Sequence, residues 1–375
     1  MKTRILFVID GLEFGGGERV FAQIISGLPK NRYEAYLACA PNDAFQKAIG
    51  GAAIRFFPMD FSNRYNFTNL RTLMRIIKKE KIDIVHGQGA RAEFYARLAA
   101  GFSGRKKCLS TLAMPVEGYD VGSMKKSLYK AMDSFSERFV DRFLVVSDVL
   151  VKTMIEGHGI AKEKVIKIYN GIETDHYSSE ALEEQRQRIR QEFFIGDTEF
   201  LIGAVGRLVW QKGFEYYLQA IPKIHEAIPN ACFILVGDGP LRKDLENQAK
   251  SLGIDKQIIF TGQRNDIRNM MAAMDVIVIP SLLEGFPMVT LEAMAMEKPI
   301  VATVIDGITE QITDGVEGIL TPPRDPHALA QAIMSLAKDR ERNRVLGNAA
   351  RKRVVRDFSV KTMIEATLTV YEDLE

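Results

Sequence analysis

Short apolar runs alternate with amphipathic helical segments along the whole chain, and this alternation limits the possible folds more strongly than any other feature. The runs are rich in valine and isoleucine, which favour buried strands, and the segments between them have helical spacing. Strands and helices that alternate in this way predict doubly wound parallel sheets of the α/β class. The predicted strands are residues 4–9, 34–39, 83–86, 107–111 and 142–146 in the first half, and 200–205, 232–236, 257–260, 275–279 and 299–303 in the second. Residues 165–172 are predicted to form a last strand and turn of the first half.

The length of the chain indicates more than one domain. A chain of 375 residues is long for a single hydrophobic core, so we expect two domains. A charged stretch at residues 180–190 separates the two series of strands, and residues 359–374 form a final amphipathic helix. We therefore divide the chain into residues 1–177, 178–358 and 359–375, with predicted helices at 325–336 and 342–356 closing the second domain.

Composition excludes several classes of protein. An apolar share of 46% and a charged share of 26% are ordinary for a soluble globular protein. No apolar run approaches the length of a membrane span, and Asp10 ends the first apolar run too early for a signal peptide. Cys39, Cys108 and Cys232 lie in apolar runs without metal-site spacing, so we expect buried thiols in a reducing, cytoplasmic setting.

The net charge of +2 hides an asymmetry between the two halves. Residues 1–175 carry 27 basic against 19 acidic side chains, and the remainder carries 23 against 29. A basic first half predicts an anionic partner. No helix-turn-helix, zinc or aromatic-platform pattern points to nucleic acid, so a phosphorylated acceptor or an anionic membrane fits better. Residues 71–79 and 123–130 are basic and amphipathic, which suits a lipid surface or simply a solvated helix face.

Two glutamates bracket a predicted helix start in Pro-Ser-Leu-Leu-Glu-Gly-Phe-Pro-Met-Val-Thr-Leu-Glu, residues 280–292. Pro287 suits the first turn of the helix, so Glu284 lies in the loop before it. Glu292 then lies in the second turn, about 8 Å along the axis from Pro287. Free backbone N–H groups between them favour an anion such as a diphosphate, and carboxylates accept hydrogen bonds from sugar hydroxyls. The pattern predicts a ligand with a sugar, a diphosphate and a ribose; ordinary surface acids are the alternative.

A basic loop follows the first predicted strand of the second half. It reads Gly-Arg-Leu-Val-Trp-Gln-Lys-Gly at residues 206–213. Arg207 offers a planar fork for phosphate oxygens, and Lys212 offers a point charge. No Asp-x-Asp pattern that would hold a divalent ion is found in the sequence. We therefore expect these two cations and backbone dipoles to neutralise a diphosphate, unless the loop is merely a solvated basic turn.

Glycine-containing turns follow other predicted strands. Gly237 begins Gly-Asp-Gly-Pro after one strand, and Arg264 follows Gly262 and Gln263 after the next. In the first half, Gly16 and Gly17 belong to a Gly-Gly-Gly loop between a strand and a helix. Ligands of open α/β sheets bind beyond the carboxyl ends of the strands, which is where all these turns fall. The Gly-Asp-Gly-Pro turn taken alone is equally consistent with a helix cap.

Together these motifs resemble family 4 glycosyltransferases, which have the GT-B fold. The resemblance rests on Glu284-x7-Glu292 within Pro-Ser-x-x-Glu-Gly-Phe-Pro, on Gly-Arg-x-x-x-x-Lys-Gly, and on Gly-Asp-Gly-Pro. It implies two Rossmann-like domains facing each other across a cleft: an acceptor-side domain at 1–177 and a donor-binding domain at 178–358. A helix at 359–375 would cross back to the first domain.

The resemblance also implies an activity. It predicts a retaining, metal-independent enzyme of the cytoplasm, with no cofactor. Such an enzyme moves a hexose-type sugar from a UDP- or GDP-linked donor to a cell-envelope glycan or glycolipid. Arg207 and Lys212 would hold the diphosphate, Glu284 the sugar hydroxyls and Glu292 the ribose. Further donor contacts carried over from the family are Gly16, Gly17, Gly206, Gly237, Arg264, Gly285, Phe286, Pro287, Met288 and Val289.

One departure from the family pattern leaves rival functions open. Many members place a histidine after the strand at 107–111 to touch the sugar, but this chain has Thr-Leu-Ala-Met at 111–114. His86 ends a neighbouring predicted strand and is the candidate to replace it as a sugar or acceptor contact. The missing histidine keeps open a catalytically inactive nucleotide-sugar-binding protein. A nicotinamide-dependent oxidoreductase is disfavoured, because Gly-x-Gly-x-x-Gly and the ribose-binding acid are both absent from the sequence.

Overall fold

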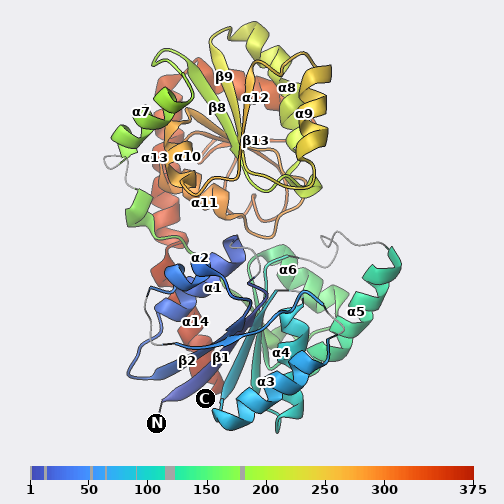
Figure 1. The fold of residues 1–375 in the computed structure, drawn as a ribbon. Helices are drawn as coiled ribbons and strands as arrows, with labels where there is room; N and C mark the ends of the chain where they lie inside the picture. Colours follow the sequence, from blue (N-terminus) through green and yellow to red (C-terminus); the bar gives the residue numbers. More distant parts are fainter. Residues whose placement is uncertain are drawn as a thin grey trace. The chain divides into compact units, whose positions relative to one another are not determined.

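The computed structural model describes residues 2–11, 15–50, 54–63, 66–89, 91–114, 123–177 and 182–375, with backbone only at 123–128. The chain divides into two compact units (Figure 1). The first unit comprises Met1–Gly171 and Val360–Glu375, and the second comprises Ile172–Ser359. The charged stretch that was expected to open the second domain begins at residues 180 and 181, which lie outside the described residues.

The first unit is built on a parallel sheet. Its described strands follow the order β3-β2-β1-β4-β5-β6-β7, and each neighbouring pair is parallel. Helices α1, α2 and α14 form one layer, and α3, α4 and α5 form another. The bounds are β1 (Thr3–Ile9), β2 (Tyr33–Cys39), β3 (Arg55–Pro58), β4 (Ile84–Gln88), β5 (Lys107–Leu112), β6 (Arg142–Val145), β7 (Val165–Lys167), α1 (Gly16–Ser26), α2 (Asp43–Ala48), α3 (Thr68–Lys79), α4 (Ala92–Phe102), α5 (Ser123–Glu137), α6 (Asp148–Lys152), η2 (Thr153–Gly157), η3 (Lys162–Lys164) and α14 (Val360–Leu374).

The second unit repeats this architecture. Its described strands follow the order β10-β9-β8-β11-β12-β13, again in parallel pairs. The α/β class with doubly wound parallel sheets is thereby confirmed. The bounds are η4 (Thr174–Tyr177), α7 (Glu183–Glu192), β8 (Phe200–Val205), η6 (Trp210–Lys212), α8 (Phe214–Ala227), β9 (Ala231–Val236), α9 (Arg242–Ser251), β10 (Ile258–Gly262), α10 (Ile267–Ala273), β11 (Val276–Ile279), α11 (Met288–Ala295), β12 (Ile300–Thr303), β13 (Ile319–Thr321), α12 (Pro326–Ala337) and α13 (Arg340–Asp357).

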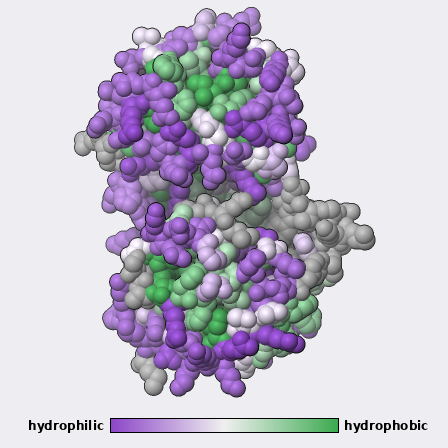
Figure 2. Space-filling view, viewed as in Figure 1, coloured by the Kyte–Doolittle hydropathy of each residue, from purple (hydrophilic) through white to green (hydrophobic). Residues whose placement is uncertain are grey.

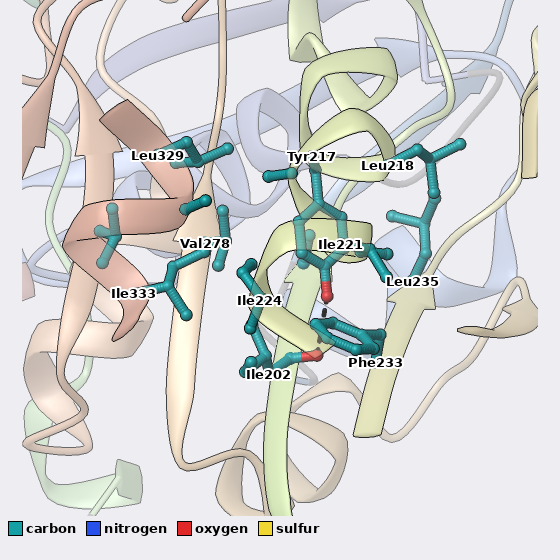
Figure 3. Packing of buried hydrophobic residues seen from close by; sticks show 14 of the residues in the cluster. Ile202, Tyr217, Leu218, Ile221, Ile224, Phe233, Leu235, Val278, Leu329 and Ile333 are labelled. Carbon is teal, nitrogen blue, oxygen red and sulfur yellow. Dashed lines mark hydrogen bonds between the residues drawn. The ribbon is translucent and has the colours of Figure 1, made fainter. Parts of the chain in front are cut away.

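A dense apolar core between the sheet and α8 holds the second unit together (Figure 3). Tyr217 of α8 is fully buried and packs beside Ile202 and Phe233 of the sheet. Its hydroxyl donates a hydrogen bond to the Ile202 carbonyl at 2.8 Å, so the one polar atom of this large side chain is satisfied. The core fixes β8, and with it the loop that follows the strand.

Two edge strands were missed in the sequence. β3 contains Arg55 and Pro58, and β13 has only three residues before a Pro-Pro pair. Edge strands lack the continuous apolar run that marks a central strand, so periodicity gives little signal for them. Within the strand and turn predicted at 165–172, the strand β7 ends at Lys167.

The final helix, α14, packs within the first unit. The Tyr371 hydroxyl lies 2.6 Å from Nδ1 of His86, and the hydroxyl of Thr3 donates to Glu375 at 2.8 Å. Arg32 forms an ion pair with Glu372. The last residues of the chain are therefore joined to its first strands by buried and exposed contacts.

The burial of the three cysteines can be compared with what their apolar surroundings in the sequence predict. Cys39 and Cys108 are buried, which raises the pKa of each thiol to about 12, whereas Cys232 is half-buried and donates to Glu199. The prediction that Cys232 is buried was therefore wrong. Polar residues dominate the coloured face in Figure 2. Over the described ranges, we find no helix that is both long and apolar enough to cross a membrane.

A buried charged network lies between α4, β5 and α5. Arg97 donates to Glu93 at 2.9 Å and to Ser110 at 2.9 Å, and Ser110 also donates to Glu93. Burial raises the pKa of Glu93 to about 7, while Arg97 and Ser110 oppose this rise and Asp133 adds to it. The first unit therefore contains a carboxyl that titrates near neutrality.

This network predicts a pH dependence of stability. Because the pKa of Glu93 is raised from 4.5 to about 7 on folding, the native state binds more protons than the unfolded state between these values. Its contribution to the free energy of unfolding therefore falls as pH rises through this window, by at most about 3 kcal/mol. The melting temperature of the wild type, measured by circular dichroism, should therefore fall as pH rises through this window. We expect the melting temperature of Glu93→Gln to fall less over the same pH range. Parallel curves for variant and wild type would contradict this expectation.

Candidate functional site

The predicted motif loops of the second unit meet at one edge of its sheet. The loop after β8 and the turn after β9 are joined by backbone hydrogen bonds from Gly206 to Val236 at 3.0 Å and from Leu208 to Asp238 at 2.9 Å. Gly237 donates in turn to the Gly262 carbonyl at 3.0 Å. The turns that contain Gly206, Gly237 and Gly262 thus form one continuous rim beyond the strand ends.

The same loop after β8 is fastened to the loop after β11. The carbonyl of Gln211 accepts hydrogen bonds from the backbone N–H groups of Leu282 and Leu283, at 2.7 and 3.2 Å. Gly213 has a left-handed φ of +60°, and a Cβ there would lie 2.2 Å from the Pro280 carbonyl oxygen. Only glycine allows this approach, so the spacing of Gly-Arg-x-x-x-x-Lys-Gly has a local structural cause.

Lys212 and Glu284 form the central ion pair of the site. Nζ of Lys212 lies 2.6 Å from Oε1 of Glu284, and the Ser281 hydroxyl donates to the same oxygen at 2.7 Å. Glu284 is 8% exposed, so the carboxylate is held by two donors rather than by water. No hydrogen bond from the described residues reaches the other oxygen, Oε2. The structure therefore joins two residues that were predicted to have separate roles.

Helix α11 begins directly after this loop. Pro287 is the N-cap rather than the first helical residue, and its carbonyl accepts a hydrogen bond from the buried Gln311 amide at 3.0 Å. Gly285 and Phe286 are buried, whereas Met288 and Val289 of the first turn are half-buried. The hydroxyl oxygen of Thr290, in that same turn, is buried without a hydrogen-bond partner among the described residues. The helix start thus combines backbone N–H donors with an unsatisfied buried hydroxyl.

Glu292 occupies the second turn of α11, as expected, and is only 6% exposed. The hydroxyl of Tyr177, from η4, donates to its Oε1 at 3.2 Å. This contact orients the carboxylate from outside the helix.

The two predicted arginines differ in their surroundings. Arg207 is exposed on the loop after β8. Arg264 is half-buried and forms hydrogen bonds with both carboxylate oxygens of Asp266 and of Glu192. These bonds raise the pKa of the Arg264 guanidinium above its ordinary value. Its side chain is therefore held by two carboxylates, and the donor contact that the family resemblance implies for this residue, through its backbone, stays a prediction.

The predicted site residues of the first unit also differ in their exposure to solvent. Gly16 is exposed at the start of α1, and a Cβ on Gly17 would lie 2.8 Å from the Gln88 amide nitrogen. His86 is fully buried, with Nδ1 at 2.6 Å from the Tyr371 hydroxyl and Nε2 at 2.7 Å from the Thr111 hydroxyl. Burial lowers the pKa of His86 to about 3. Both ring nitrogens of His86 are therefore engaged within the first unit, which counts against the predicted sugar or acceptor contact.

Several residues of the site were missed in the sequence. Ser281 lies within the Pro-Ser-x-x-Glu motif, three positions before Glu284, and that spacing was available as a signal. Gly307 packs against the loop of Glu284, since a Cβ there would lie 2.3 Å from the Gly285 carbonyl oxygen. It belongs to an Asp-Gly dipeptide after β12, and such dipeptides mark turns in a sequence. Tyr177 and Gln311 lie far from Glu292 and Pro287 in sequence, and no local pattern indicates their contacts.

Comparison with known proteins places the chain in a family. Residues 14–176 match the family model described as Glycosyltransferase Family 4, and residues 185–353 match that described as Glycosyl transferases group 1. A relative from Escherichia coli, UDP-Gal:alpha-D-GlcNAc-diphosphoundecaprenol alpha-1,3-galactosyltransferase, is 26% identical over 371 residues, covering 96% of this chain and 94% of the relative. N-acetyl-alpha-D-glucosaminyl L-malate synthase of Bacillus anthracis is 25% identical, with coverage of 94% and 88%.

A solved structure gives the same fold. HepE of Anabaena in complex with UDP and glucose superposes with a TM-score of 0.85 at 23% identity, covering 99% of this chain and all of that one. The fold is therefore GT-B, as the motifs led us to expect. With family models matching both halves, the chain is a glycosyltransferase and belongs to glycosyltransferase family 4.

Proposed function

We propose that this glycosyltransferase moves a hexose-type sugar from a UDP- or GDP-linked donor to a glycan or lipid-linked acceptor of the cell envelope. The observation that carries the proposal is the Lys212–Glu284 ion pair, which joins the loop after β8 to the loop that leads to the start of α11. Buried charge placed beside helix N–H donors is suited to an anionic ligand with hydroxyl groups. The relatives support the substrate classes, since the Escherichia coli protein is named for UDP-galactose and a diphosphoundecaprenol acceptor.

Each site residue has a role in this proposal. The diphosphate lies at the N-terminus of α11, with Lys212 and Arg207 neutralising its charge as the bond to the sugar breaks. Oε2 of Glu284 accepts a hydrogen bond from a sugar hydroxyl, while Oε1 stays with Lys212 and Ser281. Glu292, oriented by Tyr177, accepts bonds from the ribose. Gly206, Gly237 and the backbone of residues 285–289 complete the donor contacts.

We further propose retention of anomeric configuration without a metal ion. The leaving phosphate would take the acceptor proton on the same face from which it departs, so no enzyme nucleophile is required. The two cations then supply the charge stabilisation that a metal gives elsewhere. The donor would bind within residues 178–358, and the acceptor would bind within residues 1–177. The donor contacts that the family resemblance assigns to Gly16 and Gly17 stay predictions.

The rival functions have less support. An inactive nucleotide-sugar-binding protein was suggested by the missing histidine. However, the similar Escherichia coli protein is named as a galactosyltransferase, which supports an active transferase. An oxidoreductase is inconsistent with the family.

The basic first unit also suggests a cytoplasmic enzyme in peripheral contact with an anionic membrane.

A thermal-shift screen of nucleotide sugars tests the proposed donor. A donor at a hundred times its dissociation constant is expected to add about 2.7 kcal/mol to the free energy of unfolding, which raises the melting temperature. UMP, which lacks the second phosphate, serves as the matched ligand and is expected to shift it less. Stabilisation by NAD, or equal shifts from UMP and UDP-sugars, would count against the diphosphate site.

A further inference from the structure

One edge of the first unit carries an excess of exposed positive charge. The segments that lead into β4, β5, β6 and β7 all lie at the amino ends of these parallel strands. Within residues 78–83, 102–107, 135–142 and 161–164, seven exposed side chains are basic and two are acidic. The basic ones are Lys78, Lys79, Lys81, Arg105, Lys107, Arg138 and Lys162, and the acidic ones are Asp83 and Glu163. We call this edge the amino-end surface.

An exposed aromatic cluster lies within the same surface. Phe102, at the end of α4, is 52% exposed, and Phe135, near the end of α5, is 44% exposed. Phe139 lies between them, with ring centroids 5.3 Å from Phe102 and 6.0 Å from Phe135. Gly101 makes room for the Phe139 ring, because a Cβ there would lie 2.3 Å from it. The three rings are therefore a packed unit that presents two of its members to solvent.

Arg138 links the aromatic cluster to the charge. Its guanidinium carbon lies 4.1 Å from the centroid of the Phe135 ring, so cation and ring are presented together. Favourable interaction with the dipoles of α3, α4 and α5 would account for basic residues at their C-termini. The helix dipoles do not account for the two large aromatic side chains that are exposed to solvent beside these basic residues.

We propose that the amino-end surface docks on the headgroup layer of an anionic phospholipid bilayer. Phe102 and Phe135 would enter the interfacial region, and the surrounding lysines and arginines would contact the lipid phosphates. Aromatic rings prefer this boundary, and basic side chains near an anionic leaflet add attraction that salt screens. The inference deepens the membrane contact proposed above by assigning it to named residues, and it does not depend on the identity of the donor.

Co-sedimentation of the full chain with vesicles tests the surface. Wild type is expected to bind phosphatidylcholine vesicles that contain phosphatidylglycerol, less so in high salt, and only weakly to phosphatidylcholine alone. F102S/F135S is expected to lower the partition coefficient by about tenfold or more, because two apolar anchors are lost. F67S is the matched control: Phe67 is 56% exposed at the other end of α3, and its loss is expected to leave binding unchanged.

Three outcomes would overturn the proposal. These are wild-type binding to F102S/F135S, equal binding to neutral and anionic vesicles, and self-association in solution that F102S/F135S abolishes, which would make the surface an interface between copies. R105Q/R138Q keeps the aromatic rings and is expected to lose only the salt-sensitive part of binding. The donor-induced thermal shift of F102S/F135S should match wild type, so a failed docking surface and a failed transferase assignment are distinguishable.

Discussion

Replacing Lys212 by alanine is expected to lower kcat for sugar transfer by about a hundredfold or more, since a charge-stabilising donor is lost. Lys212 lies on the loop that Gln211 and Gly213 fix against the segment after β11, so its ammonium is held in place before a donor binds. Its removal also leaves Ser281 as the remaining donor to the buried Glu284 carboxylate in the described structure. The negative charge of that carboxylate would then repel an incoming diphosphate. Steady-state transfer assays with the donor found by the thermal screen measure the effect.

Two controls separate chemistry from stability. Lys243 is exposed on α9, and Lys243→Ala is expected to leave kcat unchanged. Loss of the cation beside a buried carboxylate is expected to cost about 1–3 kcal/mol of stability, so melting temperatures accompany the assays. Adding Glu284→Gln to Lys212→Ala removes the unpaired charge and should restore the melting temperature without restoring turnover. Turnover near that of wild type in Lys212→Ala would remove its diphosphate role.

Gly307→Ala is expected to displace the loop that contains Glu284, because Gly307 packs against the backbone of that loop. Gly307 has a φ of +81°, and a Cβ there would lie 2.3 Å from the Gly285 carbonyl oxygen and 3.2 Å from that of Glu284. Since backbone cannot yield as a flexible side chain does, the loop must move. We expect a loss of about 3 kcal/mol or more in stability, with a large fall in kcat because Glu284 shifts relative to Lys212.

Gly315 provides the matched control for this substitution. Its φ of +73° is similar, but a Cβ added there would meet nothing within 4 Å. Gly315→Ala therefore isolates the cost of the left-handed backbone, about 1 kcal/mol, without the steric clash. Urea unfolding and transfer assays compare the pair. Equal losses of stability and activity in the two variants would show that the close approach of Gly307 to the loop is unimportant.

Central elements were predictable because their causes are local. The strand β11 is a short β-branched run, Pro287 marks the next helix start, and β8 has the predicted bounds because its apolar run is continuous. The motif loops also followed from their place at strand ends. The edge strands β3 and β13 were missed because pairing with one neighbour requires no apolar run.

Side-chain partners were less predictable, because they depend on contacts distant in sequence. No signal in the sequence indicated the partner of the Arg264 side chain, because Glu192 lies 72 positions away. His86 ends a strand near the expected site, yet Tyr371 of the last helix completes its burial. Likewise, Lys212 pairs with Glu284 because the loop after β8 contacts the loop after β11. No local sequence pattern indicates that these two loops are in contact.

A crystal structure of this protein with UDP bound would show whether the start of α11 holds the diphosphate. We expect diphosphate oxygens within hydrogen-bonding distance of Lys212 and of the backbone N–H groups that begin α11, with the ribose at Glu292. A nucleotide bound elsewhere, or a diphosphate out of reach of that helix start, would contradict the proposed donor site.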